Sequence, residues 1–165
     1  MMEAHKTGKV ISINGPSFSG KTTFVNYLLK NLTSSLKNKK ISVVSFESAY
    51  KKDFTYDMML EFFKDKISEK LCVYDIILCE STVVVPFEDV FKVLIYPDET
   101  THKDFMLSYM NRFGQYDTLR RGRYFDTNLI RKEFANLYNF NNADMIVSSS
   151  DYESYLERIK QYASS

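Results

Sequence analysis

The sequence predicts an α/β fold built on a five-stranded parallel sheet, and two observations carry this prediction. Five short apolar runs rich in β-branched residues recur along the chain, at 10–13, 41–46, 74–79, 91–96 and 145–147. Most are continuously apolar, which is typical of parallel strands covered on both faces. Amphipathic stretches lie between them, and strand alternating with helix favours right-handed crossovers in one sheet. A mixed α+β arrangement is the alternative.

Apolar residues at helical spacing predict five helices. The first follows Lys21, the second covers 58–67, and the third contains Phe105 and Tyr109 and starts near Thr101. The fourth covers 127–138. The last follows Ser150-Asp151-Tyr152-Glu153, which has the spacing of a capping box.

Composition indicates one cytoplasmic domain spanning residues 1–165. The chain is 44% hydrophobic and 26% charged with a net charge of +1, whereas a dedicated nucleic-acid binder usually carries a large basic excess. No apolar run approaches the roughly 18 residues of a membrane span, and the N-terminus has no apolar signal core. We therefore expect no nucleic-acid or membrane partner. Cys72 and Cys79 lack metal or redox spacing and are expected to be reduced thiols.

Residues 15–22 match the phosphate-loop pattern G-x-x-x-x-G-K-[ST]. The match follows the first predicted strand and precedes the first predicted helix, as the motif requires. Its glycines let backbone N–H groups wrap a phosphate, and the helix adds its positive N-terminal end. The sequence therefore predicts a three-layer P-loop NTPase fold that binds ATP and Mg²⁺. A purely structural glycine-rich turn is the alternative. The expected nucleotide-binding residues are Gly15, Pro16, Ser17, Phe18, Ser19, Gly20, Lys21, Thr22 and Thr23.

Chemistry assigns separate roles to several residues around this loop. Lys21 is expected at the β- and γ-phosphates, and the Thr22 hydroxyl on Mg²⁺. In an open parallel sheet, ligands bind at the carboxyl ends of the strands. Glu47 and Glu80 follow the second and third predicted strands, so they should lie at that edge, with Glu80 as the metal partner. Asp75 begins the third strand and should lie at the opposite edge. An ordinary solvated position is the alternative for each glutamate.

The arginines are concentrated late in the chain, where five of the six fall within residues 112–131. The segment 112–123 contains two glycines and is predicted to be a loop that forms a small arginine-rich lid over the triphosphate, because arginine forks suit phosphate oxygens. A basic helix end that serves solubility is the alternative. The N/T-K-x-D motif of small guanine-nucleotide switches and the LSGGQ signature of transport ATPases are absent from the sequence.

Taken in order, five segments of the sequence resemble the uridine kinase family, within the group that includes phosphoribulokinase. That family combines a G-x-S-x-S-G-K-T loop, D-S-F-Y after the second strand, a strand ending in E-G, a lid ending in D-x-x-x-R-G-R, and a late A-D-x-I-I strand. The matching segments are 15–22, Glu47-Ser48-Ala49-Tyr50, 76–81, 117–123 and 143–147. The resemblance also places residues 148–150 where the family's adenine-contacting loop lies.

The resemblance implies a kinase that transfers the γ-phosphoryl group of ATP to a hydroxyl of a small molecule, with a nucleoside as the best single candidate. It places the catalytic base on Glu47, the lid arginines on Arg121 and Arg123, and acceptor binding on Glu47, Tyr50 and Asp57, beside the catalytic Lys21. The segment between Glu47 and Tyr74 is too short for the family's nucleoside-binding hairpin as well as a helix.

Other acceptors use the same machinery: an antibiotic hydroxyl, as in chloramphenicol phosphotransferase-like proteins, a nucleotide monophosphate, or a vitamin precursor. A nucleotide-binding regulatory module without phosphoryl transfer is the alternative from another class. The sequence leaves a homo-oligomer open.

Overall fold

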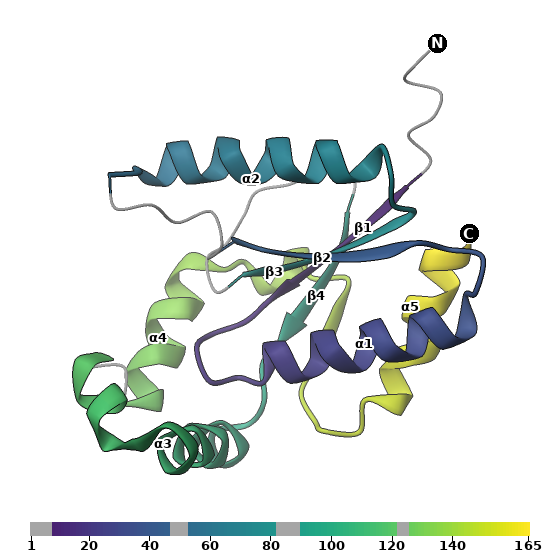
Figure 1. The fold of residues 1–165 in the computed structure, drawn as a ribbon. Helices are drawn as coiled ribbons and strands as arrows, with labels where there is room; N and C mark the ends of the chain where they lie inside the picture. The colour runs from purple at the N-terminus through teal and green to yellow at the C-terminus, as the bar shows by residue number, and fades with distance from the viewer. Residues whose placement is uncertain (1–7, 47–52, 82–89, 122–125) are drawn as a thin grey trace.

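The computed structural model describes residues 8–46, 53–81, 90–121 and 126–165, with 113–121 described by their backbone (Figure 1). Strands and helices mostly alternate along these residues. The order is β1 (Lys9–Asn14), α1 (Lys21–Ser35), β2 (Ile41–Ser45), α2 (Tyr56–Leu71), β3 (Ile76–Ser81), β4 (Phe91–Ile95), α3 (Glu99–Arg121), α4 (Thr127–Leu137), the 3₁₀ turn η4 (Phe140–Asn142), β5 (Met145–Val147) and α5 (Glu153–Ser164).

The five strands form one sheet of order β2-β3-β1-β4-β5, in which every pairing is parallel. This confirms the predicted fold class. The β-branched, continuously apolar runs became strands because both faces of each central strand are covered. In β1, Ile11 and Ile13 are fully buried on one face, and Val10 is buried on the other.

Helices cover both faces and make three layers. The buried side chains of α1 and α5 pack with Ile11 and Ile13 on one face, and these two helices lie below the sheet in Figure 1. On the opposite face, α2 packs over β1, β2 and β3, where Phe63 meets Phe46 in an edge-to-face contact of 5.2 Å between ring centroids. Further along that face, α4 packs Phe134 against Leu94 of β4.

Two aspartates accept backbone hydrogen bonds at the amino-terminal edge of the sheet. The Asp75 carboxylate accepts a hydrogen bond from the backbone N–H of Lys40 at 2.7 Å, just before β2. The Asp144 carboxylate accepts from the backbone N–H of Lys92 at 2.8 Å. Asp75 therefore lies at the edge opposite the phosphate loop, as its position at the start of a strand predicted.

Two local predictions were wrong. The segment 112–123 was expected to be a loop, but α3 continues without a break through Arg121. It contains no proline, and Gly114 alone costs a helix only about 1 kcal/mol. The capping box before the last helix does not form either: α5 begins at Glu153 with no side-chain cap, because the Tyr152 ring is held against Phe24 of α1 at 4.9 Å.

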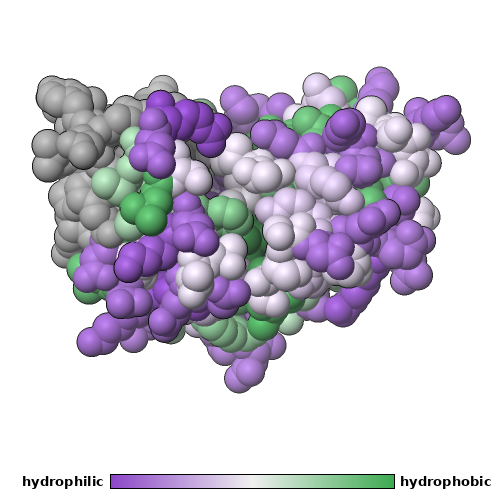
Figure 2. All heavy atoms as spheres, turned by 90° about the horizontal axis from the view of Figure 1, so that it is seen from below, coloured by the Kyte–Doolittle hydropathy of each residue, from purple (hydrophilic) through white to green (hydrophobic). Residues whose placement is uncertain are grey.

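Among the described residues, no helix combines the length and apolar character needed to cross a bilayer. The face in Figure 2 is mostly hydrophilic, with apolar side chains in small separate patches. Cys72 and Cys79 are both free thiols, and burial raises the pKa of Cys79 to about 12.

Candidate nucleotide-binding site

A cavity of about 700 Å³ opens at the carboxyl edge of the sheet, a volume within the usual range for small-ligand sites. The connections that leave β1 and β4 run to opposite sides of the sheet here, which is where open α/β sheets bind ligands. The walls of the cavity come from the segment 17–23, the ends of β2 and β3, the helix α3 and the segment before α5. They include Ser45, Glu80, Ser108, Arg112 and Ser150.

The phosphate loop, residues 15–22, has the backbone of an anion cradle. Phe18 and Gly20 have positive φ angles of 63° and 93°, and Ser19 between them does not. Such alternation turns successive N–H groups toward a common centre. The Ser19 N–H donates to the Pro16 carbonyl at 3.2 Å and closes the loop. A Cβ on Gly15 would lie 2.6 Å from the carbonyl oxygen of Ile95, so only glycine fits there.

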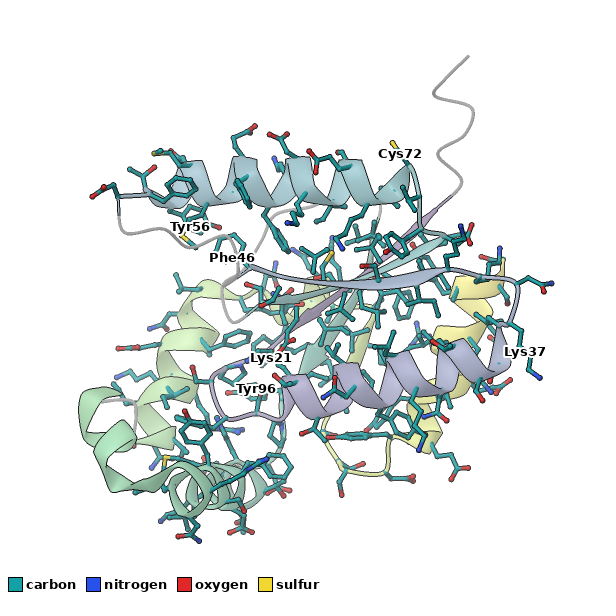
Figure 3. The ribbon with its side chains drawn as sticks, viewed as in Figure 1. Lys21, Lys37, Phe46, Tyr56, Cys72 and Tyr96 are labelled. Atoms are coloured by element: carbon teal, nitrogen blue, oxygen red, sulfur yellow. The ribbon has the colours of Figure 1, made fainter. Side chains whose placement is uncertain are left out.

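Lys21 begins α1 inside this cradle (Figure 3). Its side chain is 7% exposed, and its ammonium donates to the Pro16 carbonyl at 3.0 Å. This bond folds the lysine across the loop, where a bound anion would meet its charge. A buried ammonium is costly in an apolar setting and cheaper beside an anion. The position therefore suits the phosphate contact that the sequence predicts for Lys21.

The Thr22 hydroxyl donates to the Glu80 carboxylate at 2.6 Å. The register of β1 with β3 sets this approach, since Ile13 pairs with Glu80 just before the loop begins. Hydroxyl and carboxylate oxygens are the ligands that Mg²⁺ prefers, and it commonly takes one or two from the protein and the rest from phosphate and water. Within the described ranges, no cluster of three or more acidic, histidine or cysteine side chains offers another metal site. The metal role of this pair stays a prediction.

One buried atom tests whether the loop fits a phosphate. Ser19 is 1% exposed, and its hydroxyl is the only buried side-chain polar group without a hydrogen-bond partner in the part of the chain that the structure describes. An unsatisfied buried hydroxyl costs about 1–3 kcal/mol. Because Ser19 also lines the cavity, a phosphate oxygen bound there would supply the missing acceptor. The residues present therefore fit a phosphate group.

Buried hydrogen bonds connect Asn14, just before the phosphate loop, with Ser81, just after Glu80. The Asn14 amide donates to the Ser81 carbonyl at 3.2 Å, and the Ser12 hydroxyl donates to the Asn14 side-chain oxygen at 2.9 Å. These bonds join the carboxyl ends of β1 and β3. Sequence analysis missed Asn14, although an asparagine at the end of an apolar strand, next to the motif, was the available signal.

Aromatic side chains of α3 and the segment before α5 stand against the loop. Tyr109 meets Phe18 edge-on at 5.1 Å, and Phe105 lies so close to Gly20 that a Cβ there would approach it to 3.1 Å. Tyr152 also lines the cavity, and burial raises the pKa of its hydroxyl. Phe105 and Tyr109 were predicted only as helix-forming apolar positions, because their spacing cannot separate a core face from a cleft.

The structure describes only some of the remaining predicted site residues. Glu47, Tyr50 and Arg123 lie outside the described residues, and Arg121 is described by its backbone alone at the end of α3. Asp57 lies in the first turn of α2, is exposed, and is not among the residues that line the cavity. Their proposed roles therefore stay predictions.

Comparison with known proteins adds to this geometry. No family model matches the sequence, and no curated protein matches it. Among solved structures, APS kinase from Mycobacterium tuberculosis, in complex with AMPPNP and APS, has a TM-score of 0.61 at 14% identity, covering 96% of this chain and 99% of that one. This chain has the fold of the P-loop kinases.

Two further kinases share the fold. Shikimate kinase from Bacteroides thetaiotaomicron has a TM-score of 0.56 at 12% identity, covering 95% of this chain and 99% of that chain. A gluconokinase from Sinorhizobium meliloti has a TM-score of 0.56 at 10% identity, covering 96% and 92%. These kinases are named for different substrates, so the likeness does not single out the uridine kinase group.

Proposed function

We propose that the protein is an ATP- and Mg²⁺-dependent kinase that transfers the γ-phosphoryl group to a hydroxyl of a small molecule. The observation that carries this proposal is the Thr22–Glu80 hydrogen bond of 2.6 Å beside the buried Lys21. It places a hydroxyl, a carboxylate and an ammonium at the mouth of an anion cradle. That the structures of similar fold are themselves kinases supports it.

In this proposal the chain works by positioning and by charge neutralisation, which is what phosphoryl transfer needs. The loop N–H groups and Lys21 hold the β- and γ-phosphates. Thr22 and Glu80 would hold Mg²⁺, which supplies positive charge against the phosphate oxygens. Glu47 accepts the proton of the attacking hydroxyl, and Arg121 and Arg123 close over the triphosphate. The position of Ser45 in the cavity wall, two residues before Glu47 in the sequence, supports the role proposed for Glu47.

For the acceptor we propose a nucleoside, on the strength of the uridine kinase resemblance. The ring that such a molecule would meet near the carboxyl end of β2 is that of Tyr56, since Phe46 is buried in the core. Phe46 follows β2, and its ring centroid lies 6.1 Å from that of Tyr56 at the start of α2 (Figure 3). Tyr56 is 44% exposed and Met58 47%, so apolar surface remains open near the carboxyl end of β2.

The test is a ligand screen followed by turnover. Thermal shift with Mg²⁺ and AMPPNP is measured against nucleosides, nucleotide monophosphates, chloramphenicol and vitamin precursors. A ligand at 100 times its Kd stabilises by about 2.7 kcal/mol, which is readily measured. Each hit is then assayed for acceptor-dependent ADP release. ADP release stimulated by a nucleoside supports the full proposal, and stimulation by another hydroxyl compound changes only the acceptor. Nucleotide binding without stimulation by any acceptor would favour the regulatory module.

A further inference from the structure

A histidine that the proposed chemistry does not use connects α3 to the phosphate loop. His102 lies in the first turn of α3 and is 0% exposed, although its ring is polar. Its Nε2 lies 2.7 Å from the Ser17 carbonyl oxygen. Its Nδ1 lies 3.2 Å from Nη1 of Arg131 on α4. Both ring nitrogens are therefore engaged, one by the loop and one by a helix beyond it.

Arg131 is itself fixed in place. Its Nη1 donates to the Pro97 carbonyl at 2.6 Å, and its guanidinium lies 4.2 Å from the centre of the Tyr96 ring. Tyr96 follows β4 and is labelled below Lys21 in Figure 3. A guanidinium has donors only, and a backbone carbonyl has acceptors only. Nδ1 must therefore accept from Arg131, and Nε2 must carry the hydrogen that it donates to Ser17.

This arrangement favours a neutral imidazole. A second proton would sit on Nδ1 and face the Arg131 donor. Burial, the largest cause, lowers the pKa of His102, while the bond to Ser17 raises it, and the positive charges of Arg131 and Lys21 lower it further. Asp98, just before α3, has its carboxylate engaged by the Thr101 N–H at 2.8 Å.

The bond to Ser17 determines which way a loop N–H points. The peptide between Ser17 and Phe18 is trans, so its C=O and N–H point in opposite directions. Because the Ser17 carbonyl points toward His102 on α3, the Phe18 N–H points away from α3. Phe18 also has a φ of 63°, which costs a non-glycine residue about 1 kcal/mol or more. The loop therefore needs an outside contact to keep this conformation.

We propose that His102, held in its Nε2–H tautomer by Arg131, is a positioning residue that orients the Ser17–Phe18 peptide for phosphate binding. The inference rests on the proposed function only in that a nucleotide phosphate occupies the loop. It does not depend on an acceptor or on phosphoryl transfer. Protonation of His102 would leave the Nε2–H donor in place but turn Nδ1 into a donor that faces Arg131, which would displace the ring from its position beside the loop, so nucleotide affinity should fall at acid pH.

The experiment measures ADP binding with Mg²⁺ by calorimetry between pH 5 and 8. His102→Met keeps much of the volume and removes the donor, and we expect it to weaken ADP binding about tenfold at pH 7.5. His102→Gln places an amide donor near Nε2 and should restore most of the affinity, without the loss at acid pH. Lys103→Ala, at the exposed next position on α3, is the control and should bind like the wild type.

A readout that a merely structural role would not move is the pH profile of Arg131→Met. Without the Arg131 donor, a protonated His102 meets no opposing donor at Nδ1, so the acid loss of ADP affinity should become smaller. Long-range ¹⁵N–¹H spectra should show the Nε2–H tautomer of His102, and because the chain has two histidines, His5→Gln assigns the signals.

Each outcome decides the inference. Wild-type ADP affinity in His102→Met, with or without a lower melting temperature, would overturn it, as would an Nδ1–H tautomer. If His102→Met does not fold, His102→Gln and Arg131→Met carry the test through their pH profiles, and profiles identical to the wild type overturn it. Absence of ADP binding by the wild type would refute this inference and the proposed function together. Binding without turnover would refute only the kinase.

Discussion

Gly15→Ala tests the phosphate loop by adding a single methyl group. The new Cβ would lie 2.6 Å from the Ile95 carbonyl oxygen, 2.8 Å from the Ser19 hydroxyl and 3.2 Å from the Ile95 Cβ. A carbonyl fixed in the sheet cannot move aside, so the loop must shift by several tenths of an ångström. Overpacking of this kind costs about 1–3 kcal/mol. For a chain of this size, that is a fall of about 2–12 °C in melting temperature.

The shift should also distort the anion cradle, because the Ser19 hydroxyl lies beside the added methyl group. We expect ADP affinity, measured by calorimetry with Mg²⁺, to fall at least tenfold. Gly8→Ala is the matched control: its Cβ would meet the flexible end of Leu71 at 2.7 Å, at the opposite edge of the sheet. It should alter stability and leave ADP affinity unchanged. Equal ADP affinity in the two glycine variants would refute the account of the cradle.

Three further variants separate the roles at the site. Lys21→Ala should lower turnover at saturating ATP by orders of magnitude while the melting temperature of the free protein barely changes; near-normal turnover would contradict the kinase proposal. Glu80→Gln should raise the Mg²⁺ concentration needed for half-maximal turnover more than tenfold, and an unchanged Mg²⁺ dependence would exclude Glu80 from the metal site. Glu47→Gln should lower kcat about 10²–10⁴-fold with little change in ATP affinity, as expected for loss of a general base; a large loss of ATP affinity would move Glu47 to the metal.

The sheet could be predicted from the sequence because its signal is local. Most of the strands lie in largely apolar runs, and burial on both faces favours that pattern whatever the neighbouring strands are. The phosphate loop could be predicted for a similar reason, since its glycines and lysine act through the backbone of a single segment. The position of Glu80 could be predicted with one further inference. The carboxyl ends of parallel strands meet at one edge of the sheet, so a residue that ends such a strand lies near the phosphate loop.

Contacts between distant segments could not be predicted in this way. The bond between His102 and Ser17 spans 85 positions, and it depends on how α3 packs beside the loop. The Asn14 bond to Ser81 depends on the register of β1 with β3. The capping-box spacing before α5 is a local signal, and it failed because the packing of Tyr152 against α1 determines where that helix begins.

The extension of α3 through Arg121 changes how the predicted lid relates to the phosphate loop. His102, Phe105 and Tyr109 follow at intervals of three and four residues, so they share one face of α3. Through that face the helix meets the loop at Ser17, Gly20 and Phe18. The residues that contact the cradle and Arg121, one of the arginines predicted to close over it, are therefore carried by one helix. A nucleotide that draws the end of α3 toward its phosphates must act on the element that holds the loop. If Arg121 binds the phosphates as proposed, binding at that end of α3 would be coupled to the geometry of the loop at the other end.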